Sequence, residues 1–221
     1  TVNPVNDAPV LDVIADQEVD EDNTFTYSLS ADDVDGDVLT YTASIDGNGS
    51  VSIDGSTLTV SPADDYNGTI EVSVVASDGQ ASASGSFILT VSPVNDAPQI
   101  AAILDQTIDE DTSLTLTLSA SDIDGDELTF SAENGESNIS VDGNVLTITP
   151  PADYNSLASG SVDTVTVFVS DGIDTASTIF TLYVNPVNDA PSLDDLADGE
   201  TNEDTDFVLE LNGADVDGDE L

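Results

Sequence analysis

The sequence contains no lysine, arginine or histidine, against 46 aspartate and glutamate residues among its 221. No carboxylate can therefore pair with a cationic side chain of the same chain, and the formal charge of −46 has to be balanced by cations from solution. Recognition of phosphate needs lysine or arginine to displace condensed counterions, so nucleic acid is excluded as a partner. An anionic membrane surface is disfavoured for the same reason.

Cysteine, methionine and tryptophan are also absent. Without histidine and cysteine, the chain lacks the nitrogen and sulfur ligands of zinc, copper, haem and iron–sulfur sites, and the side chains of most nucleophile–base pairs. Only oxygen ligands remain, and these suit calcium or magnesium. No apolar run is long enough to span a membrane, so we expect no membrane insertion.

A five-residue word, Val-Asn-Asp-Ala-Pro, occurs three times and begins at Val5, Val94 and Val187, which lie 89 and 93 residues apart. Other words recur in the same phase: Glu-Asp at 21, 110 and 203, Asp-x-Asp-Gly-Asp at 33, 122 and 215, Asp-Tyr-Asn at 65 and 153, and Ser-Asp-Gly at 77 and 170. A period of this length is that of a whole domain.

The repeats predict the domain boundaries. We predict a linker from a preceding repeat at 1–9, complete repeats at 10–98 and 99–191, and the truncated start of a third repeat at 192–221. The four extra residues of the second repeat fall around Ser156 to Asp163, where a surface loop would absorb them. The chain starts without methionine and carries no secretory leader, so we expect it to be a segment of a longer protein.

Between the acidic words, short runs alternate apolar and polar residues, which is typical of half-buried antiparallel strands. In the first repeat the apolar positions are Val10 to Ile14, Phe25/Tyr27/Leu29, Leu39/Tyr41/Ala43, Val51/Ile53, Leu58/Val60, Ile70/Val72/Val74 and Phe87/Leu89/Val91. The second repeat keeps this scheme, and no run shows helical spacing with a cap. Asp54-Gly55 and Asp142-Gly143 are typical of hairpin turns. The fold class predicted is all-β, with tandem seven-stranded Greek-key sandwiches of the immunoglobulin type.

The Asp-x-Asp-Gly-Asp word places carboxylates at alternate positions, and its glycine permits a left-handed turn around an ion. An EF-hand is excluded, because it needs glycine at the sixth position and flanking helices. One such word also forms turns without an ion, but four acidic words repeated in phase favour ion binding. Two carboxylates about 4 Å apart repel by ~4 kcal/mol at an effective dielectric constant near 20, against a domain stability of ~5–15 kcal/mol. Clusters of them therefore need a divalent cation, Ca²⁺ or Mg²⁺.

These words resemble those of cadherin repeats, and more closely those of the cadherin-like tandem repeats of large bacterial surface adhesins of the repeats-in-toxin type. In order, Asp20-Glu21-Asp22, Ala31-x-Asp33-x-Asp35, Asp65-Tyr66-Asn67, Ala76-Ser77-Asp78-Gly79 and Val94-Asn95-Asp96-Ala97-Pro98 are similar to the five calcium-binding words of that family. The resemblance implies that calcium is held between modules, by ligands from the base of one, the linker, and the top of the next.

The resemblance also implies the ligand residues. For the first junction they are Glu21, Asp65, Asn95, Asp96, Asp122, Asp124 and Asp171; for the second they are Glu110, Asp153, Asn188, Asp189, Asp215 and Asp217; and at the top of the first repeat they are Asn6, Asp7, Asp33, Asp35 and Asp78. The chain departs from the family where Pro93 and Pro186 replace an aspartate of the linker and where Asn67 and Asn155 replace a bridging glutamate. We therefore expect one or two ions per junction.

The function predicted from these features is that of a non-catalytic spacer or adhesion module in a large extracellular, cell-surface protein, stiffened by calcium at its junctions. Its partners would be the neighbouring repeats, with a cell-surface or polysaccharide ligand bound through distal domains. The alternative is a carbohydrate-binding accessory module of a secreted polysaccharide-degrading enzyme. Stacking on sugars is disfavoured by the absence of tryptophan and by five tyrosines that fall mostly within strand patterns. A hydrolase with paired carboxylates is disfavoured because the repeated acids would lie at module ends.

Overall fold

In the computed structural model, residues 5–135, 137–160, 162–196 and 198–220 are described. The chain divides into two compact units, Thr1–Asn95 and Asp96–Leu221. The first unit contains one β-sandwich, called module 1, and the second contains another, called module 2, followed by a short pair of strands. No helix among the described residues has the length and apolar character needed to cross a membrane.

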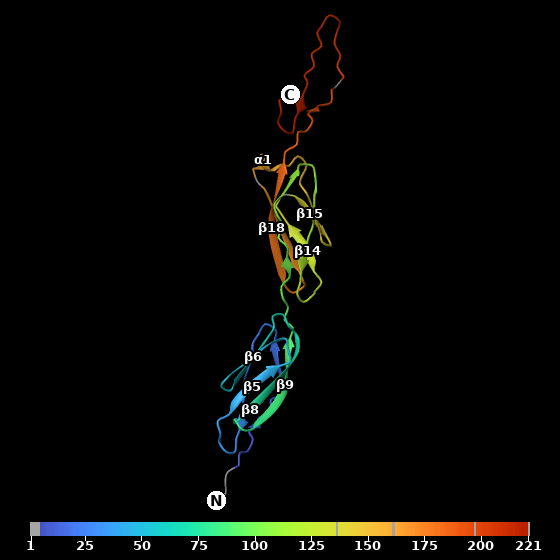
Figure 1. Ribbon diagram of the computed structural model, residues 1–221. Helices are drawn as coiled ribbons and strands as arrows, with labels where there is room; N and C mark the ends of the chain where they lie inside the picture. Colours follow the sequence, from blue (N-terminus) through green and yellow to red (C-terminus); the bar gives the residue numbers. More distant parts are fainter. Residues whose placement is uncertain (1–4, 136, 161, 197, 221) are drawn as a thin grey trace. The chain divides into compact units, whose positions relative to one another are not determined.

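Module 1 contains nine strands (Figure 1). They are β1 (Val10–Leu11), β2 (Gln17–Asp20), β3 (Phe25–Ser28), β4 (Ala31–Asp32), β5 (Thr40–Ile45), β6 (Gly49–Asp54), β7 (Thr57–Pro62), β8 (Gly68–Ser77) and β9 (Ser82–Ser92). One sheet has the order β2-β9-β8-β5, the other has the order β3-β7-β6, and β1 pairs with β4 alone.

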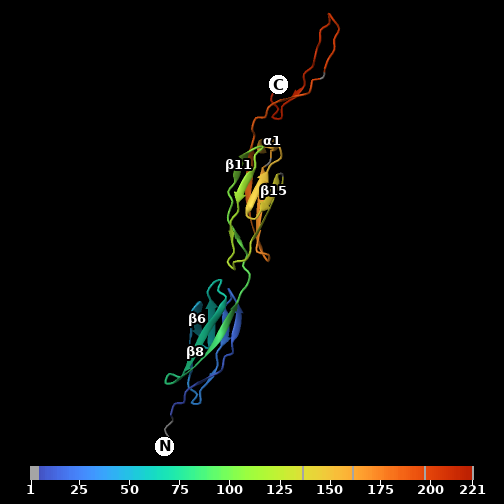
Figure 2. The same ribbon diagram turned by 90° about the vertical axis from the view of Figure 1, so that its right-hand side faces the viewer.

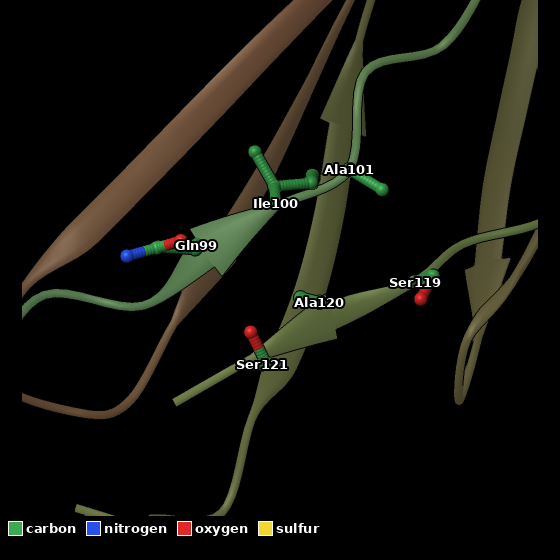
Figure 3. Close-up of a pocket in the computed structure, with 6 residues that line it drawn as sticks. All are labelled: Gln99, Ile100, Ala101, Ser119, Ala120 and Ser121. Atoms are coloured by element: carbon green, nitrogen blue, oxygen red, sulfur yellow. The ribbon is translucent and has the colours of Figure 1, made fainter. Parts of the chain in front are cut away.

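Module 2 repeats this arrangement (Figure 2). Its elements are β10 (Gln99–Ile100), β11 (Gln106–Asp109), β12 (Leu114–Thr117), β13 (Ala120–Ser121), β14 (Thr129–Glu133), β15 (Asn138–Asp142), β16 (Val145–Thr149), α1 (Ser156–Ser159), β17 (Asp163–Ser170) and β18 (Thr175–Asn185). The sheets have the orders β11-β18-β17-β14 and β12-β16-β15. Figure 3 shows the remaining pair, β10 beside β13, around a shallow uncharged hollow. After the sandwich, β19 (Ser192–Leu193) pairs with β20 (Gly213–Ala214), as β10 pairs with β13.

The predicted all-β fold of tandem sandwiches is confirmed. Each module contains two short strands that lie outside the predicted apolar runs, and in module 1 these are β2 and β4. The chain leaves the β1–β4 pair after Leu11 and crosses to the four-stranded sheet at β2. After the crossing, β2 runs parallel to β9, whereas the other strand pairs of module 1 are antiparallel. At the crossing, Asp16 Oδ1 accepts the backbone N–H of Ile88 at 2.8 Å, which satisfies a group of β9 that β2 does not reach. Alternation of residues cannot predict such a crossing, because it does not show which sheet a strand joins.

The expectation that no segment is helical is wrong for one turn, α1. It lies within the four-residue insertion, whose predicted position near Ser156 to Asp163 includes Ser161, a residue outside those described. Ser156 Oγ accepts the backbone N–H of Val184 at 2.9 Å, which ties this turn to the end of β18. Four residues are too few for a helix to be apparent from apolar spacing.

The core of each module is formed by the inward-facing residues of alternating strands. In module 1 the side chains with no exposed surface are Leu58, Val60, Ile70, Val72, Val74, Ala76 and Leu89. Tyr66 and Tyr154 pack against the two cores, and the Tyr66 hydroxyl donates to the carbonyl oxygen of Thr69 at 2.9 Å.

One buried residue of module 2 breaks the apolar pattern. Asp163 is 1% exposed and lies opposite Leu182, at the position where module 1 places Ile70 opposite Leu89. Its carboxylate accepts hydrogen bonds from Ser137 Oγ and, at 3.3 Å, from Asn134 Nδ2. The buried carboxylate thus fixes the loop between β14 and β15, a contact that Ile70 cannot make.

The alternation of β18 generates a stability prediction that a leucine pair can test. Leu182→Ala removes a side chain with no exposed surface, and large-to-small changes of this kind lower the free energy of unfolding by about 2–5 kcal/mol. Leu104→Ala, in the same unit but 81% exposed, should change it by about 0.5 kcal/mol or less. Urea unfolding of both variants in calcium-containing buffer measures the difference. Equal losses would contradict the assigned core.

Candidate metal centre at the module ends

The acidic loop, 33–37 in the first repeat, 122–126 in the second and 215–219 in the third, wraps around the carboxylate of its first aspartate. Asp33 Oδ1 accepts the backbone N–H groups of Asp35 and Asp37 at 2.9 and 3.2 Å. Asp122 and Asp215 accept two backbone N–H groups each in the same way. The glycine of each loop is left-handed, with φ between +77° and +81°, a conformation that costs other residues energy.

The second oxygen of this first aspartate is not used by the turn. Oδ2 of Asp33 and Oδ2 of Asp122 are enclosed, and neither has a hydrogen-bond partner in the described part of the chain. A carboxylate oxygen shut away from water without a donor is costly. Turn formation alone therefore does not explain why the carboxylate is there, whereas a cation at that oxygen would.

The linker before each repeat is bound to the acidic loop by one recurring hydrogen bond. The backbone N–H of Asp7 donates to Asp35 Oδ2 at 2.7 Å, and that of Asp189 donates to Asp217 Oδ2 at 2.7 Å. Asp96 donates to Asp124 in the same way at 2.8 Å. Because the bond recurs in all three repeats, the side chain of the linker aspartate is placed beside the loop each time.

A buried glutamate at the base of each module accepts a hydrogen bond from the linker that follows. Glu21 is 1% and Glu110 is 3% exposed, and their Oε1 atoms accept the backbone N–H groups of Val94 and Val187, each at 2.6 Å. Oε2 of Glu110 also accepts from Asn155 Nδ2 at 3.2 Å. These carboxylates are held by neutral donors only, so their negative charges remain uncompensated in the interior.

The second unit contains one complete junction, where base, linker and acidic loop meet. Glu110, Asp189 and Asp217 can each place a carboxylate oxygen within 4.8 Å of the others, and so can Asp111, Asp153 and Asp189. Asp189 of the linker belongs to both groups. Its Oδ2 is enclosed and, like that of Asp33, has no hydrogen-bond partner among the described residues.

The pKa of Asp189 at this junction shifts in the opposite direction to that of Asp78, whose carboxylate accepts several hydrogen bonds from the protein. The pKa of Asp189 is raised above its ordinary value by partial removal from water and then by the charges of Asp153, Asp111, Asp217 and Glu110, in that order. The pKa of Asp78 is instead lowered, first by the backbone N–H of Ala81 and then by the side chain of Asn6. Asp189 thus lies where negative charge has accumulated.

The second junction brings together four of its six predicted ligands: Glu110, Asp153, Asp189 and Asp217. Asp215 holds the turn of the loop, and the side chain of Asn188 donates to the carbonyl oxygen of Asp189 at 2.8 Å. The residues predicted for the first junction are divided between the units, with Glu21, Asp65 and Asn95 in the first and Asp96, Asp122, Asp124 and Asp171 in the second. The predicted ligand set stays a prediction.

At the top of module 1, Asp33 and Asp35 come together with Asp37, and Asn6 Nδ2 donates to Asp78 Oδ2 at 2.9 Å. Asp78 Oδ1 accepts the backbone N–H groups of Gln80 and Ala81, both at 2.6 Å, and Asp171 binds its own loop in the same way.

Sequence reasoning missed Asp111 and its counterpart Asp22. Both are left-handed, with φ of +60° and +59°, and each accepts a backbone N–H, from Asp153 at 3.2 Å and from Asp65 at 3.1 Å. The signal was available, because the second residue of the Glu-Asp word recurs in phase as Asp22, Asp111 and Asp204.

Comparison with known proteins gives a family and a fold. A model of the bacterial Ig domain matches residues 6–90 and again residues 95–183. Chitinase A of Pseudoalteromonas piscicida is 25% identical over 200 residues, which cover 86% of this chain and 23% of the chitinase. The chain thus spans about a quarter of the length of that relative.

Solved structures with a similar fold include human protocadherin-24 EC1-2, at a TM-score of 0.50 and 15% identity over 81% of this chain and 99% of that one. Drosophila N-cadherin EC1-4 is 18% identical over 86% of this chain and 54% of that one, at a TM-score of 0.38.

The raised pKa of Asp189 generates a prediction whose sign depends on calcium. A carboxyl with a raised folded-state pKa binds its proton more tightly in the folded chain, so its contribution to stability is present below the ordinary pKa of 3.8 and is lost as pH rises through the raised value. At neutral pH in chelator, Asp189→Asn removes this unfavourable charge and should raise the melting temperature of the second unit. In excess calcium the same change should lower it, because a ligand is lost.

Asp142→Asn is the control, since it makes the same change of charge at an exposed hairpin turn outside the junction. Its effect should be small in both buffers. Differential scanning calorimetry in chelator and in calcium measures all three chains. An equal decrease for Asp189→Asn in both buffers would show that Asp189 serves packing alone.

Proposed function

The chain belongs to the bacterial Ig domain family, and we propose that its modules are calcium-binding spacers of a larger extracellular surface protein, stiffened by the ions held at module junctions. The observation that carries the proposal is the position of Asp189, a linker residue that belongs to both carboxylate groups and has one enclosed oxygen without a hydrogen-bond partner among the described residues. No cationic side chain exists to neutralise these groups.

The residues at the second junction fit calcium. Glu110, Asp111, Asp153, Asp189 and Asp217 supply hard oxygen ligands, and calcium takes six to eight of these in flexible geometry. Backbone carbonyls and water would complete the shell. Magnesium fits less well, because it demands a near-ideal octahedron and releases its water reluctantly. Two groups of three carboxylates share Asp189, so we propose one or two ions at this junction.

The stiffening follows from where these ligands lie along the chain. Glu110, Asp111 and Asp153 belong to the base of module 2, Asp189 to the linker, and Asp217 to the loop of the following repeat. An ion bound to all three parts loses ligands when the linker swings. The same words surround the first linker in the sequence, so we extend the proposal to Glu21, Asp65, Asn95, Asp96, Asp122, Asp124 and Asp171. The mechanism is mechanical and needs no catalytic group.

Two settings suit such a spacer. The repeats resemble those of repeats-in-toxin type adhesins, which favours a surface adhesin. The similarity to chitinase A favours a second candidate, a non-catalytic accessory part of a secreted polysaccharide-degrading enzyme. In both settings the modules would hold another domain away from a surface, and the family match is compatible with either.

Calcium should stabilise the chain and do so through the junction residues. With a dissociation constant of ~10⁻⁴ M, as in extracellular modules, calcium at 100 times that concentration adds about 2.7 kcal/mol to the free energy of unfolding. Isothermal titration should give a weaker constant for Asp189→Asn than for Asp142→Asn, and a weaker one for magnesium than for calcium. Equal affinities for the two variants would favour diffuse counterion condensation on an acidic surface.

The stiffening itself is tested by small-angle X-ray scattering. Without calcium, the acidic module ends repel and the linker samples many orientations, so the distance distribution should be broad. Calcium should make it narrower, and Asp96→Asn should weaken this effect more than Asp142→Asn does. If calcium raises the melting temperature while the distribution stays unchanged, the ions bind within modules and the spacer mechanism is wrong.

A further inference from the structure

The outer face of β17 and β18 in module 2 carries no charged side chain. The inward residues of these strands are apolar, apart from Asp163 and Thr178, and alternate with outward residues along both strands. The outward residues are Thr164, Thr166, Phe168 and Ser170 on β17, and Thr175, Ser177, Ile179, Thr181, Tyr183 and Asn185 on β18. In a chain with 46 acidic residues among 221, these ten outward positions carry none. Carboxylates lie only at their margins: Glu133 of β14 opposite Thr166, Asp109 of β11 opposite Asn185, and Asp105 at the backbone N–H of Thr181.

Three large apolar side chains form a line on this surface. Ile179 is 60% and Tyr183 is 43% exposed, and Phe168 is half-buried. Phe168 lies opposite Ser177 in the strand register, so the line follows β18 from Ser177 to Tyr183. The six steps between these seven residues extend over roughly 20 Å. Threonine and serine hydroxyls flank the line on β17 and between its members.

Module 1 lacks the line although it has the same strands. Its register places Val75, Ser86 and Thr90 at the positions of Phe168, Ile179 and Tyr183, and Glu71 at the position of Thr164. Module 1 does carry two outward apolar residues on this face, Val75 and Ile88, but no aromatic side chain. The two aromatic residues of module 2 are therefore not required by the sandwich. Aromatic side chains that the fold does not need, gathered with Ile179 on one face, point to a ligand.

We propose that this face of module 2 binds an extended neutral polysaccharide. The apolar faces of pyranose rings can stack on Tyr183 and Phe168, and an aromatic side chain offers such contact area at a small entropic cost. Threonine and serine hydroxyls both donate and accept hydrogen bonds, which matches the hydroxyls of sugars. The linear arrangement suits a chain of several sugar units.

The negative charge of the chain disfavours anionic ligands and a second copy of the chain on this face. The net charge of −46 repels anionic polysaccharides and acidic proteins, whereas a neutral glycan approaches without such a barrier. A second copy of the chain carries the same charge, and the line is interrupted by hydroxyl residues, which is unlike the contiguous apolar centre of a dimer interface. A tyrosine that points into the core of the sandwich cannot stack on a sugar. Tyr183 faces outward and can.

The test uses the whole chain in calcium and measures its retention on microcrystalline cellulose, chitin and an anionic control, alginate. We expect retention on at least one of the neutral polymers. The triple variant Phe168→Val, Ile179→Ser and Tyr183→Thr introduces the residues of module 1 and should reduce retention at least tenfold. Asp189→Asn should retain binding, since the face shares no residue with the junction, so failure of the calcium proposal and failure of this one are distinguishable.

A reciprocal variant of module 1 tests the proposal even if the triple variant of module 2 does not fold. Val75→Phe, Ser86→Ile and Thr90→Tyr transfer the line to module 1 and should increase retention on the same polymer. No retention on either neutral polymer, full retention by a folded triple variant, or equal retention on alginate would each overturn the proposal. So would sedimentation showing that the wild type dimerises and that the triple variant does not.

Discussion

Repulsion between carboxylates without an internal counter-charge is the constraint on which the rest of this structure depends. In most proteins an acidic cluster is relieved by lysine or arginine, but here every charge carries the same sign. The chain relieves part of the repulsion with backbone N–H groups, as Asp33, Asp122 and Asp215 show. These bonds leave some oxygens unsatisfied, and such oxygens occur where module, linker and loop meet. Backbone N–H groups therefore satisfy only part of these carboxylate oxygens, and the remaining negative charge has to be balanced by cations from solution.

Much of the fold could be predicted from the sequence, because alternation and turn chemistry are local signals. Asp54-Gly55 and Asp142-Gly143 form hairpin turns as expected, with Gly55 and Gly143 left-handed at φ of +60° and +59°. The crossing between β1 and β2 could not be predicted, since strand alternation does not reveal which sheet a strand joins. The buried Asp163 was equally hidden, because its apolar environment comes from strands distant in the sequence.

The candidate site was predictable to a similar degree. The resemblance implied Glu110, Asp153, Asp189 and Asp217, which recur in phase with the repeats and which the structure brings together. Asp111 recurs in phase as well, but the left-handed turn that orients its carboxylate appears only in three dimensions. Differences between the repeats also point to residues that the fold does not require. In the sequence, Phe168 and Tyr183 look like ordinary strand residues. The register of module 1 has Val75 and Thr90 at their positions, so the sandwich forms without aromatic side chains there.

The parallel pairing of β2 with β9 determines how module 1 responds to force. Because the two strands run in the same direction, the chain enters β2 at one end of the pair and leaves β9 at the other. Tension between the termini therefore loads the pair in shear, with the four register positions from Gln17 to Asp20 strained together and not opened one by one. Hydrogen bonds that must break simultaneously resist extension better than bonds that unzip in sequence. In a module held under load, the strand crossing that the sequence concealed would therefore place this shear-loaded pair between the two ends of the chain.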